Sequence, residues 1–177
     1  MPAYVALLRA VNVGGTGRLP MAELTALGRE AGFQNVSTYI TSGNLIFQSR
    51  LPEAKVRAAL AERLAACVGR PVGVLVRSAE ELAGIVARNP FPGEPGHRVM
   101  VLFTDEPLPP DPRAGVAGRQ EERIVAGRRE FLVFYPQGQA RSRLRIPAAA
   151  AGTARNMNTV AKLAALAGAL ASAAPAA

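Results

Sequence analysis

Apolar runs broken by glycine and proline divide the first half of the chain into short elements. The first run, over 4–11, is almost wholly apolar, which predicts a strand covered on both faces. Residues 20–31 carry apolar side chains at helical spacing and are followed by a terminating Gly32, which predicts a helix. The other elements predicted in this half are a β-hairpin of strands 36–41 and 45–49, a helix from Pro52 to near Gly69, and a strand over 71–77.

The order of these elements, β-α-β-β-α-β, is typical of the ferredoxin-like split βαβ unit. In that unit two helices cover one face of an antiparallel sheet. We therefore expect a ferredoxin-like α+β subdomain over residues 1–77.

The second half of the chain carries a similar set of signals. Ser78 precedes a helical pattern over 79–88, and strands are expected over 97–104 and in a hairpin across 123–135, with a proline-rich loop between them. A last helix carries an apolar stripe made by Val160, Leu163, Leu166 and Leu170. The sequence thus predicts a second α+β subdomain over 78–177, which ends in a frayed tail. The expected fold class is α+β, with two ferredoxin-like (α-β plait) subdomains and antiparallel sheets.

Composition adds a positive charge to this picture. The 177 residues are 49% apolar and 19% charged, which is enough to bury a core, and 21 basic residues exceed 13 acidic ones for a net charge of +8. Residues 1–88 (10 bases, 6 acids) and residues 89–177 (11 bases, 7 acids) each carry +4. The charge favours an anionic partner. Because 19 of the 21 bases are arginine, biased codon usage is an alternative source of the excess.

The residues that most metal and nucleophile chemistry requires are scarce. One cysteine, Cys67, cannot form an internal disulfide, and with one histidine, His97, no Cys/His zinc site can be assembled. We therefore predict no metal site, and the residues indicate neither a cofactor nor a reaction. No apolar run is long enough to span a membrane and no charged leader precedes an apolar segment, so we expect a cytoplasmic protein without a membrane partner.

Two loops of the first subdomain are expected to meet at one end of its sheet. Strands 1 and 2 of a split βαβ unit run parallel, so the loop after the first strand and the tip of the hairpin lie at the same end. The first loop leads into a helix N-terminus, where backbone N–H groups and the helix dipole favour an anion and glycines allow its close approach. The ligand-binding residues predicted here are Asn12, Gly14, Gly15, Arg18, Ser42, Gly43 and Asn44.

Structural interpretations of the same residues stay open. The two glycines can serve only to turn the chain from strand to helix, and Ser42-Gly43-Asn44 can be an ordinary hairpin turn. The loop lacks the Lys-Ser/Thr pair of a P-loop, and Pro20 stands where a dinucleotide fingerprint has glycine. Glu23, close to the first turn, can also neutralise the helix end.

A second group of polar residues, Thr153-Ala-Arg-Asn-Met-Asn-Thr159, stands before the last helix. Four of its side chains are capable N-caps although one cap is enough, and no acidic residue occurs after Glu130 against five basic ones. Arg155, Asn156 and Asn158 are therefore predicted to contribute to phosphate or carboxylate binding. The alternative is a solvated basic loop before a capped helix.

Five separated stretches carry a family resemblance: Tyr4-Val-Ala-Leu-Leu-Arg-Ala-Val-Asn-Val-Gly-Gly15, Met21-Ala-Glu-Leu24, Thr38-Tyr-Ile-Thr-Ser-Gly-Asn44, Tyr135-Pro-Gln-Gly138 and Thr153-Ala-Arg-Asn-Met-Asn-Thr-Val160. Together they resemble the bacterial family called domain of unknown function 1697. The resemblance spans essentially the whole chain and implies an α+β protein of two ferredoxin-like subdomains, with no established activity. The chain departs from the family pattern at Ala10, Arg143 and Met157, where glycine, lysine and tryptophan are usual.

The leading functional hypothesis is a protein that binds a small anionic, phosphate-bearing ligand at the loop end of the first subdomain. The glycines would donate backbone N–H groups, and Arg18 and Arg155 would neutralise charge. One alternative is a nucleic-acid-binding module that uses a basic surface, although only 5% of the residues are aromatic. Another alternative is a non-catalytic structural or interaction protein. Neither a reaction nor an oligomeric state is predicted.

Overall fold

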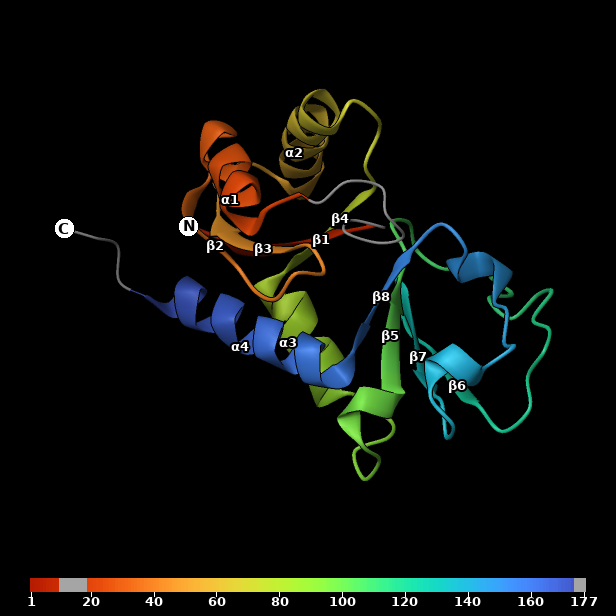
Figure 1. The fold of residues 1–177 in the computed structure, drawn as a ribbon. Helices are drawn as coiled ribbons and strands as arrows, with labels where there is room; N and C mark the ends of the chain where they lie inside the picture. Colours follow the sequence, from red (N-terminus) through yellow and green to blue (C-terminus); the bar gives the residue numbers. More distant parts are fainter. Residues whose placement is uncertain (10–18, 174–177) are drawn as a thin grey trace. The chain divides into compact units, whose positions relative to one another are not determined.

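A computed structural model describes residues 1–9 and 19–173 of the chain (Figure 1). The chain divides into two compact units, one of Met1–Gly84 together with Lys162–Ala177 and the other of Ile85–Ala161. The last helix, α4 (Met157–Ser172), passes from the second unit into the first. The first unit is therefore built from both ends of the chain.

The first unit contains a four-stranded antiparallel sheet with the strand order β2-β3-β1-β4. Its strands are β1 (Ala3–Leu8), β2 (Gln34–Thr38), β3 (Asn44–Gln48) and β4 (Val74–Ser78). In the central strand β1, Val5 is paired with Ile46 on one side and with Arg77 on the other. All residues of β1 and β3 are buried, as the apolar run in the sequence predicts for a strand covered on both faces.

Helices α1 (Met21–Glu30) and α2 (Glu53–Val68) lie together on one face of this sheet (Figure 1). Their apolar stripes pack on the strands in one buried core. The buried leucines and valine of the two helices are Leu24, Leu27, Val56, Leu60 and Leu64. The predicted β-α-β-β-α-β order of the first half is confirmed.

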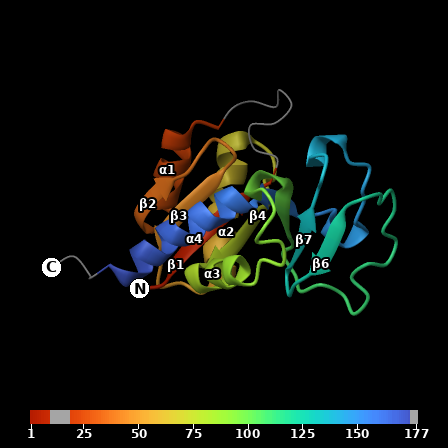
Figure 2. The ribbon, with the colours of Figure 1, turned by 90° about the horizontal axis from the view of Figure 1, so that it is seen from below.

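The other face of the sheet carries α3 (Ala79–Ala87) and the part of α4 that starts at Lys162 (Figures 1 and 2). The side-chain amide of Gln48 donates a hydrogen bond to the carbonyl of Leu170 at 3.2 Å. A capping box opens α3, because Glu81 N–H donates to Ser78 Oγ at 3.1 Å and Ser78 N–H donates to Glu81 Oε2 at 2.8 Å. Ser78 is thus the N-cap of α3.

The second unit repeats the strand order of the first without helices in its connections. Its sheet has the order β6-β7-β5-β8 and consists of β5 (Val99–Phe103), β6 (Arg123–Ala126), β7 (Glu130–Phe134) and β8 (Thr153–Asn156). The loop between β5 and β6 holds four prolines, and the chain between β7 and β8 forms only two 3₁₀ turns, Gln139–Arg141 and Pro147–Ala149. Proline removes a helical hydrogen bond and clashes with the preceding turn, which accounts for the missing helix between β5 and β6.

Loop side chains close one face of the second sheet. Tyr135 and the β7 residues Phe131 and Val133 form a buried cluster with Ile146 from the following loop and Ile124 from β6. Backbone hydrogen bonds of 2.8 and 3.0 Å between Ala117 and Arg145 join the two long loops over this cluster. The α+β class with antiparallel sheets is therefore confirmed in both units.

Two local predictions are wrong. Residues 153–156 are expected from the sequence to be a capping loop, but they form β8, with Arg155 paired to Val101 of β5. Its polar residues give no strand pattern, and hydrogen bonding to β5 overrides the weak local preference. The first hairpin strand ends at Thr38, so Tyr39 and Ile40 belong to the turn.

Candidate functional site

The loop that carries Asn12, Gly14, Gly15 and Arg18 lies outside the described residues. The structure describes the elements on either side of it. β1 ends at Leu8, and α1 begins after Pro20, which is its N-cap and makes no side-chain capping hydrogen bond. Along the chain, the loop of the expected anion site therefore has β1 before it and α1 after it.

The end of β1 is in direct contact with the tip of the hairpin. Leu8 N–H donates a hydrogen bond to the carbonyl of Gly43 at 2.9 Å. Gly43 has φ +82°, and a Cβ added to it would lie 2.9 Å from Leu8 Cβ, closer than real side chains approach. The turn at Ser42 and Gly43 thus lies beside the point where the chain leaves β1, as the parallel-strand argument expects.

The buried side chain of Asn44 stabilises the turn through hydrogen bonds. Its side chain is fully buried and its Nδ2 donates to the carbonyl of Tyr39 at 3.0 Å and to Ser42 Oγ at 2.9 Å. Tyr39 N–H donates in return to the carbonyl of Asn44 at 3.2 Å. These two hydrogen bonds lie within the hairpin, and one of them positions Ser42.

Ile40 lies at the tip of this hairpin in a strained backbone conformation. Its φ is +51°, and its side chain is 48% exposed. A β-branched residue in the left-handed region is a true outlier that costs about 1–3 kcal/mol, and such outliers gather at binding and catalytic sites. Exposure of a large apolar side chain in a strained turn marks the tip as a functional candidate.

Glu23, near the start of α1, forms a hydrogen bond with a side chain of α2. Glu23 Oε1 accepts a hydrogen bond from the thiol of Cys67 at 2.8 Å. This hydrogen bond is the main reason that the pKa of Cys67 is raised, with desolvation adding to it. The contact draws the Glu23 carboxylate toward α2, while its charge still stabilises the first turn of α1.

Arg155 is a buried side chain of the second unit. It is 7% exposed, and its Nη1 donates to Thr153 Oγ1 at 2.8 Å and to the carbonyl of Ala154 at 2.9 Å. Loss of hydration lowers its pKa to about 10. Its position in β8 differs from the helix N-terminus that the sequence indicates.

Asn156 and Asn158 lie at the start of α4. Asn156 Oδ1 accepts a hydrogen bond from Thr159 N–H at 2.9 Å, so Asn156 is the N-cap. Asn158 is exposed, and a Cβ added to Gly96 would lie 2.1 Å from its Oδ1. Asn156 thus has a structural role as the N-cap, and the part of Asn156 and Asn158 in ligand binding stays a prediction.

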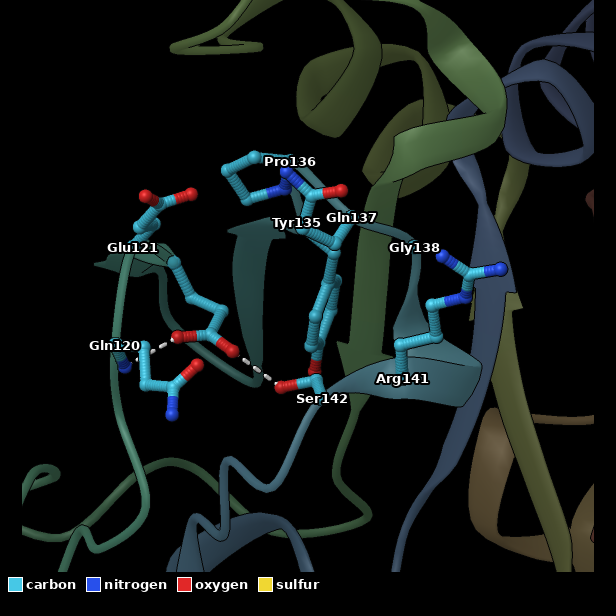
Figure 3. A pocket seen from close by; sticks show the side chains of 9 residues that line it. Gln120, Glu121, Tyr135, Pro136, Gln137, Gly138, Arg141 and Ser142 are labelled. Atoms are coloured by element: carbon cyan, nitrogen blue, oxygen red, sulfur yellow. Dashed lines mark hydrogen bonds between the residues drawn. The ribbon is translucent and has the colours of Figure 1, made fainter.

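The second unit contains a hollow of about 190 Å³ that no sequence pattern indicates (Figure 3). We call it the Tyr135 hollow; residues 120–122, 135–138, 141 and 142 line it. Tyr135 and Glu122 are 4% and 6% exposed, while Arg141 and Glu121 are exposed. The Tyr135-Pro-Gln-Gly138 stretch was a sequence signal, but nothing in the sequence pairs it with Glu122.

Hydrogen bonds hold Glu122 in place at the hollow. Its carboxylate accepts from the hydroxyl of Ser142 and, at 2.6 Å, from Gln120 N–H (Figure 3). The Ser142 hydroxyl is the main reason that the pKa of Glu122 is lowered, which keeps the buried carboxylate ionised. Burial raises the pKa of Tyr135, so its phenol stays neutral near neutral pH.

Within residues 1–9 and 19–173, no three metal-ligating His, Cys, Asp or Glu side chains come together. No helix in the same residues is long and apolar enough to cross a bilayer.

Comparison with known proteins agrees with the family resemblance. A family model described as "Protein of unknown function (DUF1697)" matches residues 1–131. A solved structure, of the conserved bacterial protein SP0830 from Streptococcus pneumoniae, is 24% identical with a TM-score of 0.78, and the match covers 94% of this chain and 98% of that one. At this identity the likeness concerns the fold. No curated protein matches the chain. With well over half of its length matched, the chain belongs to the DUF1697 family of proteins of unknown function.

Proposed function

We propose that this protein binds a small anionic, phosphate-bearing ligand at the loop end of its first unit. The observation that carries the proposal is the contact between Leu8 and Gly43, which places the hairpin tip beside the start of the glycine-rich loop. Strain at Ile40 supports a functional role for the same tip. No reaction is assigned to the site.

Each group of residues has a distinct task in this proposal. Gly14 and Gly15 allow a phosphate to approach the backbone, and the start of α1 supplies N–H groups and the positive end of a helix dipole. Arg18 supplies a full charge in a geometry suited to phosphate oxygens. Asn12 and Ser42 orient the ligand, with Asn44 holding Ser42 in place.

Arg155, Asn156 and Asn158 belong to the second unit and are treated as a separate anion-binding candidate. Because Arg155 is hydrogen-bonded within β8, its substitution is expected to affect stability first. An Arg155→Ala variant therefore has to be compared with wild type for both melting temperature and ligand response.

Thermal-shift measurements test the proposal. Inorganic phosphate, nucleotides, sugar phosphates and acyl phosphates are added to wild type and to Arg18→Ala. We expect at least one of these anions to raise the melting temperature of wild type and to do so much less in Arg18→Ala. Arg29→Ala, at the opposite end of α1, is the matched control and should respond like wild type. The proposal fails if no anion stabilises wild type more than Arg18→Ala.

A specific observation also keeps nucleic-acid binding as a second candidate. Between residues 141 and 146, exposed Arg141, Arg143 and Arg145 alternate with Ser142, Leu144 and Ile146, which are less exposed. The backbone is extended at Ser142, so Arg141 and Arg143 on either side of it are about 6–7 Å apart. Such a row of guanidinium groups suits a chain of phosphates.

Filter binding to single-stranded RNA tests this second candidate. Affinity should fall steeply as salt rises, and a variant with Gln at all three positions should show a smaller salt slope. Arg128→Gln, at another exposed arginine of the second unit, is the control. Absence of binding at low salt would remove nucleic acid as a partner.

A further inference from the structure

We propose that a second hollow of the second unit, beside Leu102, binds a small neutral ring molecule that carries one amide-like polar group. We call it the Leu102 hollow; its volume is about 220 Å³. Residues of β5 and β8 line it together with residues of the loop that joins β7 to β8. All of them belong to the second unit, so the proposal is independent of the anion site in the first.

The two units differ at the sheet position where this hollow lies. Leu102 of β5 is paired with Ala154 of β8, and the corresponding pair in the first unit is Ala6 of β1 and Val76 of β4. Ala6 and Val76 are fully buried in one core with the leucines of α2, whereas Leu102 and Ala154 are only partly buried. A loop with two 3₁₀ turns replaces the helix between β7 and β8, so apolar surface of the second sheet faces the hollow.

The loop between β7 and β8 limits the size of the occupant. Leu144, Ile146 and Ala149 of this loop line the hollow, and backbone hydrogen bonds between Arg145 and Ala117 hold the loop in place. The remaining volume of about 220 Å³ is less than one turn of a helix occupies. An apolar cavity of about 150 Å³ is enough to hold benzene. A single ring with one substituent therefore fits the hollow.

The side chains that line the hollow are uncharged. Among the described residues, neither arginine, lysine, aspartate nor glutamate contributes to the lining, although the chain carries a net charge of +8. A charged ligand would lose hydration in the hollow without gaining an ion pair. Leu102, Leu144 and Ile146 instead offer apolar contact area. The lining therefore favours a neutral ligand with an apolar ring.

Gln139 supplies a polar group at the hollow. Its side chain is exposed, lines the hollow and forms a hydrogen bond with Tyr135. A side-chain amide has two N–H donors and an acceptor oxygen, so it can form more than this one hydrogen bond. An amide group on the ligand is complementary to it, because that group also carries both a donor and an acceptor. This feature distinguishes the expected ligand from a plain hydrocarbon.

The experiment uses the full-length ¹⁵N-labelled protein and follows the amide signals of Gly152 and Ala154. Four probes are titrated: benzamide, nicotinamide, benzoate and benzylamine. Benzoate and benzylamine keep the ring of benzamide but carry a negative and a positive charge. We expect benzamide and nicotinamide to shift the signals at millimolar concentration, and the charged probes to bind about tenfold more weakly.

Two variants test the ring site and the polar group separately. Ala154→Leu adds an isopropyl group to the wall of the hollow and should abolish the shift of Gly152. Ala126→Leu, at an exposed position of β6 that does not line the hollow, is its control. Gln139→Glu places a carboxylate at the hollow and should strengthen benzylamine binding by about threefold. Gln137→Glu adds the same charge at an exposed position outside the hollow and should leave benzylamine unchanged.

The outcomes decide the proposal even if Ala154→Leu does not fold, because Gln139→Glu changes an exposed residue. Loss of benzamide binding in Ala154→Leu, or stronger benzylamine binding in Gln139→Glu alone, supports the proposal. It is overturned if neither benzamide nor nicotinamide shifts the signals of wild type, or if benzoate or benzylamine binds as tightly as benzamide. Folded variants that all bind like their controls would overturn it as well. Because no probe carries a phosphate, each of these results leaves the anion proposal for the first unit unaffected.

Discussion

The carbonyl of Gly43 accepts a hydrogen bond of 2.9 Å from the backbone N–H of Leu8, which ties the hairpin tip to the last residues of β1. A side chain at Gly43 would collide with Leu8, because an added Cβ would lie 2.9 Å from Leu8 Cβ. The turn that borders the proposed anion site is therefore held by backbone contact and tolerates little change.

Gly43→Ala should destabilise the protein more than Gly32→Ala. Both glycines have positive φ, so each substitution carries the left-handed penalty of about 1–2 kcal/mol. Only Gly43 has a neighbour within contact distance, and overpacking adds about 1–3 kcal/mol. Urea unfolding of the two variants measures the difference. Equal losses in the free energy of unfolding would show that Leu8 moves aside at no cost.

Ile40→Asn should raise the free energy of unfolding by about 1 kcal/mol, because asparagine tolerates the left-handed region that isoleucine resists. The same substitution should weaken anion binding if the hairpin tip contacts the ligand. Thr41→Asn is the control, since its exposed neighbouring position has no positive φ. Thermal unfolding of wild type, Ile40→Asn and Thr41→Asn checks the order of their stabilities. A loss of stability in Ile40→Asn would mean that contacts of the Ile40 side chain outweigh its backbone strain.

Ser78→Ala should cost about 1 kcal/mol of stability because it removes the acceptor for Glu81 N–H at the start of α3. The reciprocal hydrogen bond from Ser78 N–H to Glu81 makes the two substitutions non-additive. A double-mutant cycle with Glu81→Ala, measured by denaturant unfolding, should give a coupling energy above about 0.5 kcal/mol. Additive losses would show that the capping box does not act as a unit.

Glu122→Gln should lower the free energy of unfolding at pH 7 by about 1–3 kcal/mol, with a dependence on pH. The pKa of Glu122 in the folded protein is below its ordinary value of about 4.3, so the folded state favours the ionised form. This contribution is fully present above the unfolded pKa and is lost as pH falls through the folded pKa. The difference in the free energy of unfolding between wild type and Glu122→Gln, measured with urea, should therefore become smaller below about pH 4.3. Glu80→Gln, at an exposed position, controls for the loss of a carboxylate.

Most of the fold could be predicted because its signals are local. Helices α1 and α2 show apolar spacing between a proline and a glycine, and the hairpin shows Ser42-Gly43-Asn44 between two apolar runs. β8 could not be predicted, because an edge strand of polar residues depends on its neighbour β5 for its hydrogen bonds. A second ferredoxin-like subdomain was expected, but the absence of helices from the connections of the second sheet was not.

The candidate sites also combine features that the local sequence indicates with features that depend on distant residues. Ser42 and Gly43 stood out because turn residues in a short loop have a recognised chemistry, and the contact between Gly43 and Leu8 agrees with the argument from parallel strands. The buried state of Asn44 and Arg155 was not foreseen, because burial depends on neighbours distant in sequence. Glu122 escaped notice for the same reason, since Ser142 lies 20 residues further along the chain.

The amino-acid sequence by itself determined the α+β class, the order of most elements and the family, because these follow from local periodicity, turn chemistry and motif order. Only the tertiary structure decided that α4 returns to the first unit and that Tyr135 and Glu122 enclose a hollow. It also decided that Arg155 is buried in a strand, whereas the sequence indicated a basic group at a helix N-terminus. The physical reason is that desolvation and close packing depend on which distant segments meet, and no local pattern of residues encodes that.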